Sequence, residues 1–124
     1  MINIFLVLYL LLSHWIADFI FQDEKWALSK KSSFKSLLKH TITYSLVMGY
    51  LFMFVFNLFN LILFIIFAFM SHTAVDYFTS KWVGKMFSQN KLGSSIPNFG
   101  AFSIIGLDQL IHYIVLIFTL YILY

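Results

Sequence analysis

The sequence predicts an all-α fold: a polytopic membrane protein with four transmembrane helices in a single domain, residues 1–124. The chain is 61% hydrophobic and only 10% charged, a composition typical of integral membrane proteins. Its apolar residues gather into stretches of about the 20 residues that a helix needs to cross a bilayer. These stretches are residues 2–22, 37–57, 60–80 and 101–123, and they leave no room for a separate soluble domain.

The first stretch is expected to stay in the mature protein. Its start, residues 1–5, carries no basic residue, and His14 and Asp18 interrupt its apolar run. A cleaved signal peptide instead has a basic start followed by an apolar segment. We therefore interpret residues 2–22 as the first helix of the bundle.

The connections between the stretches differ in character. Residues 57–60 form a short, uncharged link between the second and third helices. Residues 23–36 place apolar side chains such as Trp26 among Lys and Ser, a pattern typical of a short amphipathic helix at the membrane surface. The connection before the last helix is expected to turn at residues 96–98, which contain the single Pro of the chain.

The basic residues predict how the bundle is oriented. All eight are lysines, and they lie at or between the ends of particular stretches: Lys25, Lys30, Lys31, Lys35, Lys39, Lys81, Lys85 and Lys91. Lysine-rich loops stay on the cytoplasmic side of a membrane, so we expect two cytoplasmic loops and an N-out/C-out topology. Each Lys near the surface attracts anionic lipid headgroups by about 1 kcal/mol. Membrane lipids are the expected partners, and nothing in the chain predicts binding to nucleic acid.

All four histidines and three of the five acidic residues lie inside the apolar stretches. Three pairs are spaced i, i+4, and one residue stands alone: His14 with Asp18, His72 with Asp76, Asp108 with His112, and His40. Residues four apart share a helix face, and counting turns from the cytoplasmic helix ends puts all seven in the cytoplasmic half. One ionised Asp at the bilayer centre costs about 2.5–3.5 kcal/mol, so three cost about 8–10 kcal/mol. Another interaction must offset this cost.

A metal centre is the leading hypothesis for this cluster. The chain has no Cys, so an ion would be held by imidazole and carboxylate groups, which helical bundles place on facing helices. Three Asp carry three negative charges, which two divalent ions with a bridging hydroxide would balance. The expected cofactor is a divalent metal, as two ions of Zn, Mn or Fe. The expected ligands are His14, Asp18, His40, His72, Asp76, Asp108 and His112.

The alternative is a polar network without metal, which could also conduct protons. Polar contacts within membranes contribute only about 0.6 kcal/mol on average. His–Asp pairs would therefore recover little of the insertion cost unless the Asp residues were protonated.

Other polar residues are expected next to the cluster. Gln22 follows Asp18 by four positions, so it could hydrogen-bond a ligand or a substrate. Gln109 and Tyr44 are candidates for the same role. Weaker candidates are Thr41, Thr79 and Tyr77.

Several strings in the chain carry a family resemblance. They are His14-Trp15-Ile16-Ala17-Asp18-Phe19-Ile20-Phe21-Gln22 followed by Trp26-Ala27 and Lys30, then His40, His72-x-x-x-Asp76-Tyr77 and Asp108-Gln109-x-x-His112. In order and spacing they resemble domain-of-unknown-function family 3307, small membrane proteins of bacteria and phages. The resemblance implies a multi-span protein of a bacterial inner membrane, of host or phage origin, and implies no reaction. More distantly, the arrangement is similar to proteins labelled membrane-bound metal-dependent hydrolases.

A hydrolase is the leading functional hypothesis, in which the metal cleaves a phosphoester or ester of a lipid-type substrate at the cytoplasmic interface. The sequence does not identify the catalytic base. A proton or metal-ion transporter or channel is the first alternative, because ionisable residues within membranes often mark ion paths. A non-catalytic phage or host membrane factor is the second alternative. A homo-oligomer is compatible with each of them.

The lysine pattern makes a prediction about topology. A reporter fused after Tyr124 should report the outer side of the membrane, and one inserted near Lys30 should report the cytoplasm. Paired reporters that are active on opposite sides measure this directly. The reverse result would also remove the assignment of the cluster to the cytoplasmic half.

Overall fold

The computed structural model describes residues 2–93, 96–97 and 99–124, and these residues form helices joined by turns and loops, with no strand. In chain order the elements are α1 (Ile4–Trp15), its π-helical continuation η1 (Ile16–Ile20), α2 (Glu24–Ser29), α3 (Phe34–Phe52), α4 (Leu58–Ser88) and α5 (Ala101–Leu123). The all-α prediction is confirmed. The turn expected at residues 96–98 includes Asn98, which lies outside the described residues.

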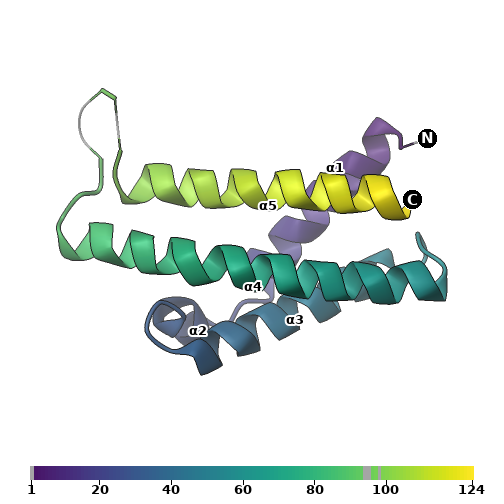
Figure 1. The fold of residues 1–124 in the computed structure, drawn as a ribbon, viewed down its shortest axis with the longest axis horizontal. Coiled ribbons are helices and arrows are strands. Elements are labelled where there is room, and N and C mark those ends of the chain that lie inside the picture. The colour runs from purple at the N-terminus through teal and green to yellow at the C-terminus, as the bar shows by residue number, and fades with distance from the viewer. Residues whose placement is uncertain (1, 94–95, 98) are drawn as a thin grey trace.

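Helix α4 is the centre of the bundle. Helices α3 and α5 both pack along it, and α1 crosses obliquely to contact α3 and α5 (Figure 1). Both termini lie at one end of the molecule, and α2 lies towards the opposite end. The last residues of α4 and the first residues of α5 also lie at the end opposite the termini (Figure 1).

Polar side chains set where the helices begin. Asn3 Oδ1, before α1, and Asn57 Oδ1, before α4, each accept a hydrogen bond from the backbone N–H three residues further on, at 2.9 and 3.0 Å. Asp23 and Ser33 cap α2 and α3 in the same way. These side chains satisfy N–H groups that have no partner within the first turn of a helix.

The expectation of four membrane-spanning helices is met in part. Helices α4 and α5 are long and apolar enough to cross a membrane, whereas the apolar run Ile4–Ile20 is shorter. Helix α3 ends at Phe52 rather than at residue 57, and it begins with a segment that carries Lys35 and Lys39. The expected span 60–80 forms the middle of the longer α4, and 101–123 matches α5.

The long apolar helices expose most of their surface. Only 17% of the most apolar 18-residue window of α4 and 28% of that of α5 is buried within the chain. Large side chains such as Met70 and Phe118 are more than 60% exposed. A core helix of a soluble protein would be mostly buried, so this exposed apolar surface supports a membrane location.

An apolar core fills the half of the bundle that lies nearest the termini. It includes Leu10 from α1, Phe52 from α3, Phe64 from α4 and Leu120 from α5, each with no exposed surface. The rings of Phe52 and Phe64 lie 4.8 Å apart between centroids. This layer closes the inside of the bundle at the end where the termini lie.

The contact between α3 and α4 depends on Gly49. A Cβ added there would lie 2.5 Å from both Cγ1 and Cδ1 of Ile65. We expect Gly49→Ala to lower the free energy of unfolding by about 1–3 kcal/mol, because it overfills a packed contact. The measurement is thermal or denaturant unfolding in one detergent.

The matched control is Gly106→Ala. Gly106 is exposed on α5 with nothing within 4 Å of an added Cβ, so Ala there should add about 0.5–1 kcal/mol of stability. The cost of Gly49→Ala should also shrink when Ile65 is replaced by Ala. An unchanged cost in the Ile65→Ala background would mean that the two residues do not clash.

Candidate metal centre

The seven expected ligands meet at one place, at the edge of the apolar core. The four long helical segments contribute them: His14 from α1, Asp18 from η1, His40 from α3, His72 and Asp76 from α4, and Asp108 and His112 from α5. Six of the seven are buried, and Asp108 is half-buried. The pairs spaced i, i+4 point inward because each occupies one face of its helix.

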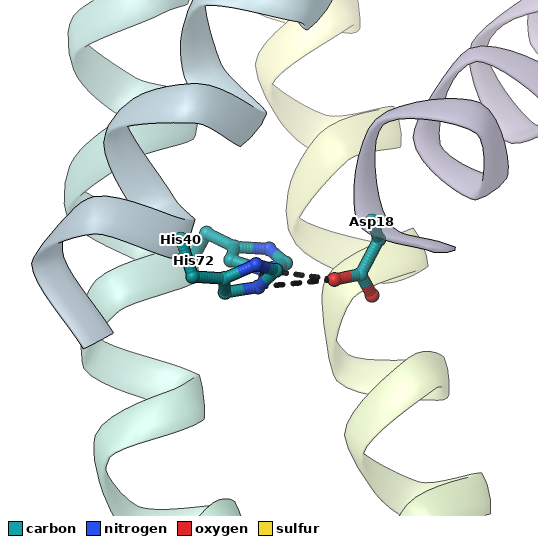
Figure 2. A group of neighbouring side chains, drawn as sticks. All are labelled: Asp18, His40 and His72. Carbon is teal, nitrogen blue, oxygen red and sulfur yellow. Dashed lines mark hydrogen bonds and ion pairs between the residues drawn. The ribbon is translucent and has the colours of Figure 1, made fainter. Parts of the chain in front are cut away.

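Four donor atoms converge at the centre of this cluster. His40 Nε2 and His72 Nε2 lie 3.0 Å apart. Asp18 Oδ1 is 3.2 Å from the first nitrogen and 3.3 Å from the second, and Asp76 Oδ2 is 3.2 and 3.6 Å from them. Figure 2 shows both imidazoles directed at the same carboxylate oxygen of Asp18.

The spacings around Asp18, His40 and His72 suit a metal ion. Bonds of about 2.0–2.1 Å from zinc to nitrogen or oxygen put neighbouring ligand atoms about 3.3 Å apart in a tetrahedron. The three distances among Asp18 Oδ1, His40 Nε2 and His72 Nε2 are 3.0, 3.2 and 3.3 Å. These three residues can therefore hold a metal ion, and Asp76 Oδ2 lies beside them.

Hydrogen bonds alone satisfy this arrangement poorly. A neutral imidazole carries a single N–H, and each of the two Nε2 atoms faces the other nitrogen and two carboxylate oxygens. If both nitrogens carried hydrogen, the two donors would face each other at 3.0 Å. If only one did, that N–H would have to serve three acceptors. A cation placed between Asp18, His40 and His72 satisfies all three together.

A second group of donors adjoins the first. Asp76 Oδ1 lies 3.3 Å from His112 Nε2, and His112 Nε2 lies 3.6 Å from Asp108 Oδ1. His72, Asp76 and His112 also have ligand atoms close enough to share an ion. The carboxylate of Asp76 thus belongs to both groups, with one oxygen directed to each.

His14 lies beside these groups with both ring nitrogens already occupied. Its Nδ1 is 2.8 Å from the hydroxyl of Tyr44, and its Nε2 is 3.0 Å from Oε1 of Gln109. The distance from Nε2 to Asp18 Oδ2 is longer, 3.8 Å. In this arrangement His14 is held between Tyr44 and Gln109, and both of these residues lie next to the cluster.

The local backbone of the first helix presents Asp18. After Trp15 the helix widens into a π-helical turn, in which the N–H of Phe21 donates to the carbonyl of Ile16 at 3.1 Å. Such turns are frequent at functional sites because they redirect side chains out of the regular α-helical positions. Asp18 lies in the middle of this turn.

The other predicted polar residues divide into two groups. Gln109 Nε2 donates to Asp108 Oδ2 at 3.0 Å and to Asp18 Oδ2 at 3.3 Å, and the hydroxyl of Thr79 donates to Asp108 Oδ1. Thr41 instead accepts a hydrogen bond from Thr73. Tyr77 points outward, where it is 38% exposed and lies under the ammonium group of Lys81.

Lys30 is the residue at the site that the sequence did not predict. It follows α2, and its ammonium nitrogen lies 2.7 Å from Asp76 Oδ2. Burial disfavours the charged form of Lys30, but the negative charge of Asp76 outweighs this and raises the Lys30 pKa above its ordinary value. Three carboxylates within apolar stretches and no Arg in the chain could have suggested that a Lys reaches the cluster.

The contact between His14 and Tyr44 leads to a prediction. Tyr44→Phe leaves Nδ1 of the buried His14 without its partner, so it should lower the free energy of unfolding by about 1–3 kcal/mol. Tyr50→Phe is the control, because Tyr50 is 73% exposed. Thermal unfolding of both variants in the same detergent measures the difference. Two equally small effects would mean that this contact does not stabilise the cluster.

Comparison with known proteins gives a family for the chain. The model of a family described as "Protein of unknown function (DUF3307)" matches residues 6–124. No curated protein and no solved structure matches the chain, and the expected similarity to membrane-bound hydrolases is not among the findings. Since the match covers nearly the whole chain, the protein belongs to the DUF3307 family.

Proposed function

We propose that this protein is a membrane-embedded metalloprotein that hydrolyses an ester bond, a phosphoester or carboxylic ester of a lipid-type substrate. The observation that carries the proposal is the convergence of Asp18, His40 and His72 at distances of 3.0–3.3 Å, with Asp76 beside them. Two imidazoles and two carboxylates, brought together from η1, α3 and α4, are ligands suited to Zn, Mn or Fe.

The residues have distinct parts in this proposal. His40, His72, Asp18 and Asp76 would hold the first ion, and His112 with the second oxygen of Asp76 would hold another. A bound divalent ion lowers the pKa of water and stabilises negative charge that develops on an attacked ester. Gln109 and Thr79 fix the orientation of Asp108 and Asp18 by hydrogen bonds.

Lys30 affects how many ions the cluster needs. The three carboxylates carry three negative charges, and Lys30 contributes one positive charge next to Asp76. One divalent ion then brings the cluster to neutrality with neutral imidazoles. Lys30 pairs with Oδ2 of Asp76, the oxygen that faces His40 and His72, whereas Oδ1 faces His112. We therefore propose that an ion at the first position competes with Lys30 for Oδ2, and that an ion at the second position does not.

The proposal includes four helices that cross the membrane, with the lysine-bearing connections in the cytoplasm. Both termini lie at the end opposite α2, as that topology requires. The shorter apolar run Ile4–Ile20 and helix α3 cover α4 and α5 in the bundle. The site then lies in the cytoplasmic half, within reach of lipid headgroups.

Transport is less well supported than hydrolysis. An ion path needs a polar route on both sides of the cluster. On the side of the termini the interior is filled by apolar side chains without exposed surface, including Met48, Phe52, Phe64 and Leu120. This layer supports a site that is open to one side only.

Metal binding is tested by removing one carboxylate. Asp76→Asn or Asp108→Asn should lower metal affinity by at least about 10–100-fold and lower the melting temperature, because binding energy contributes to folding energy. Removal of metal by a chelator should lower the melting temperature of the wild type to a similar extent. The measurements are metal stoichiometry by elemental analysis and thermal unfolding, on protein without a His-tag.

Asp23→Asn is the matched control. Asp23 is exposed and caps α2, and Asn caps a helix about as well as Asp, so metal content and melting temperature should not change. A network of hydrogen bonds predicts a different result, since Asn is nearly isosteric with a protonated Asp. Wild-type protein without stoichiometric metal, together with Asn variants as stable as the parent, would exclude the metalloprotein.

A further inference from the structure

A cavity of about 240 Å³ adjoins the metal centre on the side of α2. Its inner end is formed by Asp18, Asp76, Asp108 and Gln109, and its walls come from η1, α2, α4 and α5. A ligand in this cavity would therefore contact the carboxylates that face the proposed ions. The volume is below the range of about 300–1,000 Å³ typical of pockets that enclose whole drug-sized ligands, so it suits a headgroup rather than an entire lipid.

Two polar atoms in the cavity wall have no partner. The side-chain oxygen of Gln22 and the hydroxyl of Ser80 are buried without a hydrogen bond among the described residues. A buried polar group without a partner costs about 1–3 kcal/mol, so such groups are rare unless a ligand or water satisfies them. Because Gln22 and Ser80 both line the cavity, a polar ligand there could satisfy these atoms once either side chain turns towards it.

The cavity also has basic residues and a narrow point. Lys30 and Lys31 both line it. A Cβ added at Gly84, on the opposite wall, would lie 2.8 Å from Cδ of Lys31. The absence of a side chain at Gly84 therefore keeps this part of the cavity open, because a larger residue would fill it. Lys31 can place its charge next to a ligand in the cavity.

The outer rim of the cavity is apolar and exposed. Phe19 is 46% exposed, Leu28 68% and Phe87 44%, and all three line the cavity. A ligand with a polar anionic end and an apolar tail matches a cavity that is polar inside and apolar at its rim, because the tail would lie over the rim. A wholly polar ligand would leave the rim uncovered.

We propose that this cavity binds the phosphate headgroup of a membrane lipid, with Lys31, Ser80 and Gln22 as headgroup contacts and Gly84 as the residue that keeps the entrance open. The inference rests on the proposed function, because the three carboxylates repel a phosphate unless a bound ion and the lysines compensate them. It adds the ligand class and the residues that select it.

The test is ligand-induced stabilisation of the full chain in an uncharged detergent with Mn²⁺ or Zn²⁺ present. Dihexanoyl phosphatidic acid should raise the melting temperature in a concentration-dependent way, because a ligand that binds only the folded state stabilises it. Dihexanoyl phosphatidylcholine, which has no net charge, should bind more weakly. Glycerol phosphate and inorganic phosphate, which have no tail, should also bind more weakly.

Three variants address the individual contacts. Lys31→Met and Ser80→Ala should each weaken binding of dihexanoyl phosphatidic acid about tenfold, the effect of losing one hydrogen bond to a charged group. Gly84→Leu should abolish binding by filling the cavity. Their controls are Lys25→Met, on the exposed face of α2, and Gly106→Leu, at an open position on α5.

The outcomes separate this inference from the proposed function. Bound metal in the wild type and in all three cavity variants, with the predicted losses of lipid binding, supports it. Bound metal without stabilisation by any phosphate compound overturns the inference and leaves the metal centre standing. Absence of metal from the wild type contradicts the proposed function itself.

Two further results would also overturn the inference. Equal binding of glycerol phosphate and dihexanoyl phosphatidic acid would mean a soluble phosphate ester rather than a lipid. If the wild type and Gly84→Leu both bind dihexanoyl phosphatidic acid and dihexanoyl phosphatidylcholine equally well, the lipids associate with the apolar surface outside the cavity.

Ser80→Ala keeps the test informative if Gly84→Leu does not fold. Since Ser80→Ala removes a hydroxyl without a partner, that variant is expected to fold.

Discussion

The arrangement of this protein depends on two imidazole nitrogens that face each other, 3.0 Å apart, between two carboxylates. His40 and His72 bring α3 and α4 together, and Asp18 brings the end of the first helix to the same point. Asp76 then links the group to His112 on α5. Such a concentration of charge is costly in a buried place, and the positive charge of Lys30 next to Asp76 offsets part of this cost.

The bundle is divided into halves with different tasks. Apolar side chains such as Phe52, Phe64 and Leu120 fill the half nearest the termini and contribute packing without any exposed surface. Polar residues fill the next layer, and the cavity leads from that layer towards α2. The apolar half also excludes water from one side of the cluster, which strengthens electrostatic interactions there.

Sequence periodicity predicted the cluster well because helix geometry decides which residues share a face. The pairs His72 with Asp76 and Asp108 with His112 needed only the i, i+4 rule, and both meet in the structure. Lys30 was not predicted, since the path of a connection is not encoded in a helical repeat. The end of α3 at Phe52 was also missed, because apolar residues continue beyond it and the stop comes from the turn before Asn57.

Charge links the parts of the site that lie on different elements. In the proposed metal-bound state, one divalent ion and Lys30 balance the three carboxylates, so a bound phosphate would leave an excess of negative charge. Lys31 on the cavity wall can supply part of the missing positive charge, and a second ion between Asp76 and His112 can supply the rest. Because the first ion and Lys30 would use the same oxygen of Asp76, Oδ2, binding of the first ion there would free Lys30 to face the phosphate. Ion number, the position of Lys30 and the anionic ligand are then coupled through a single carboxylate.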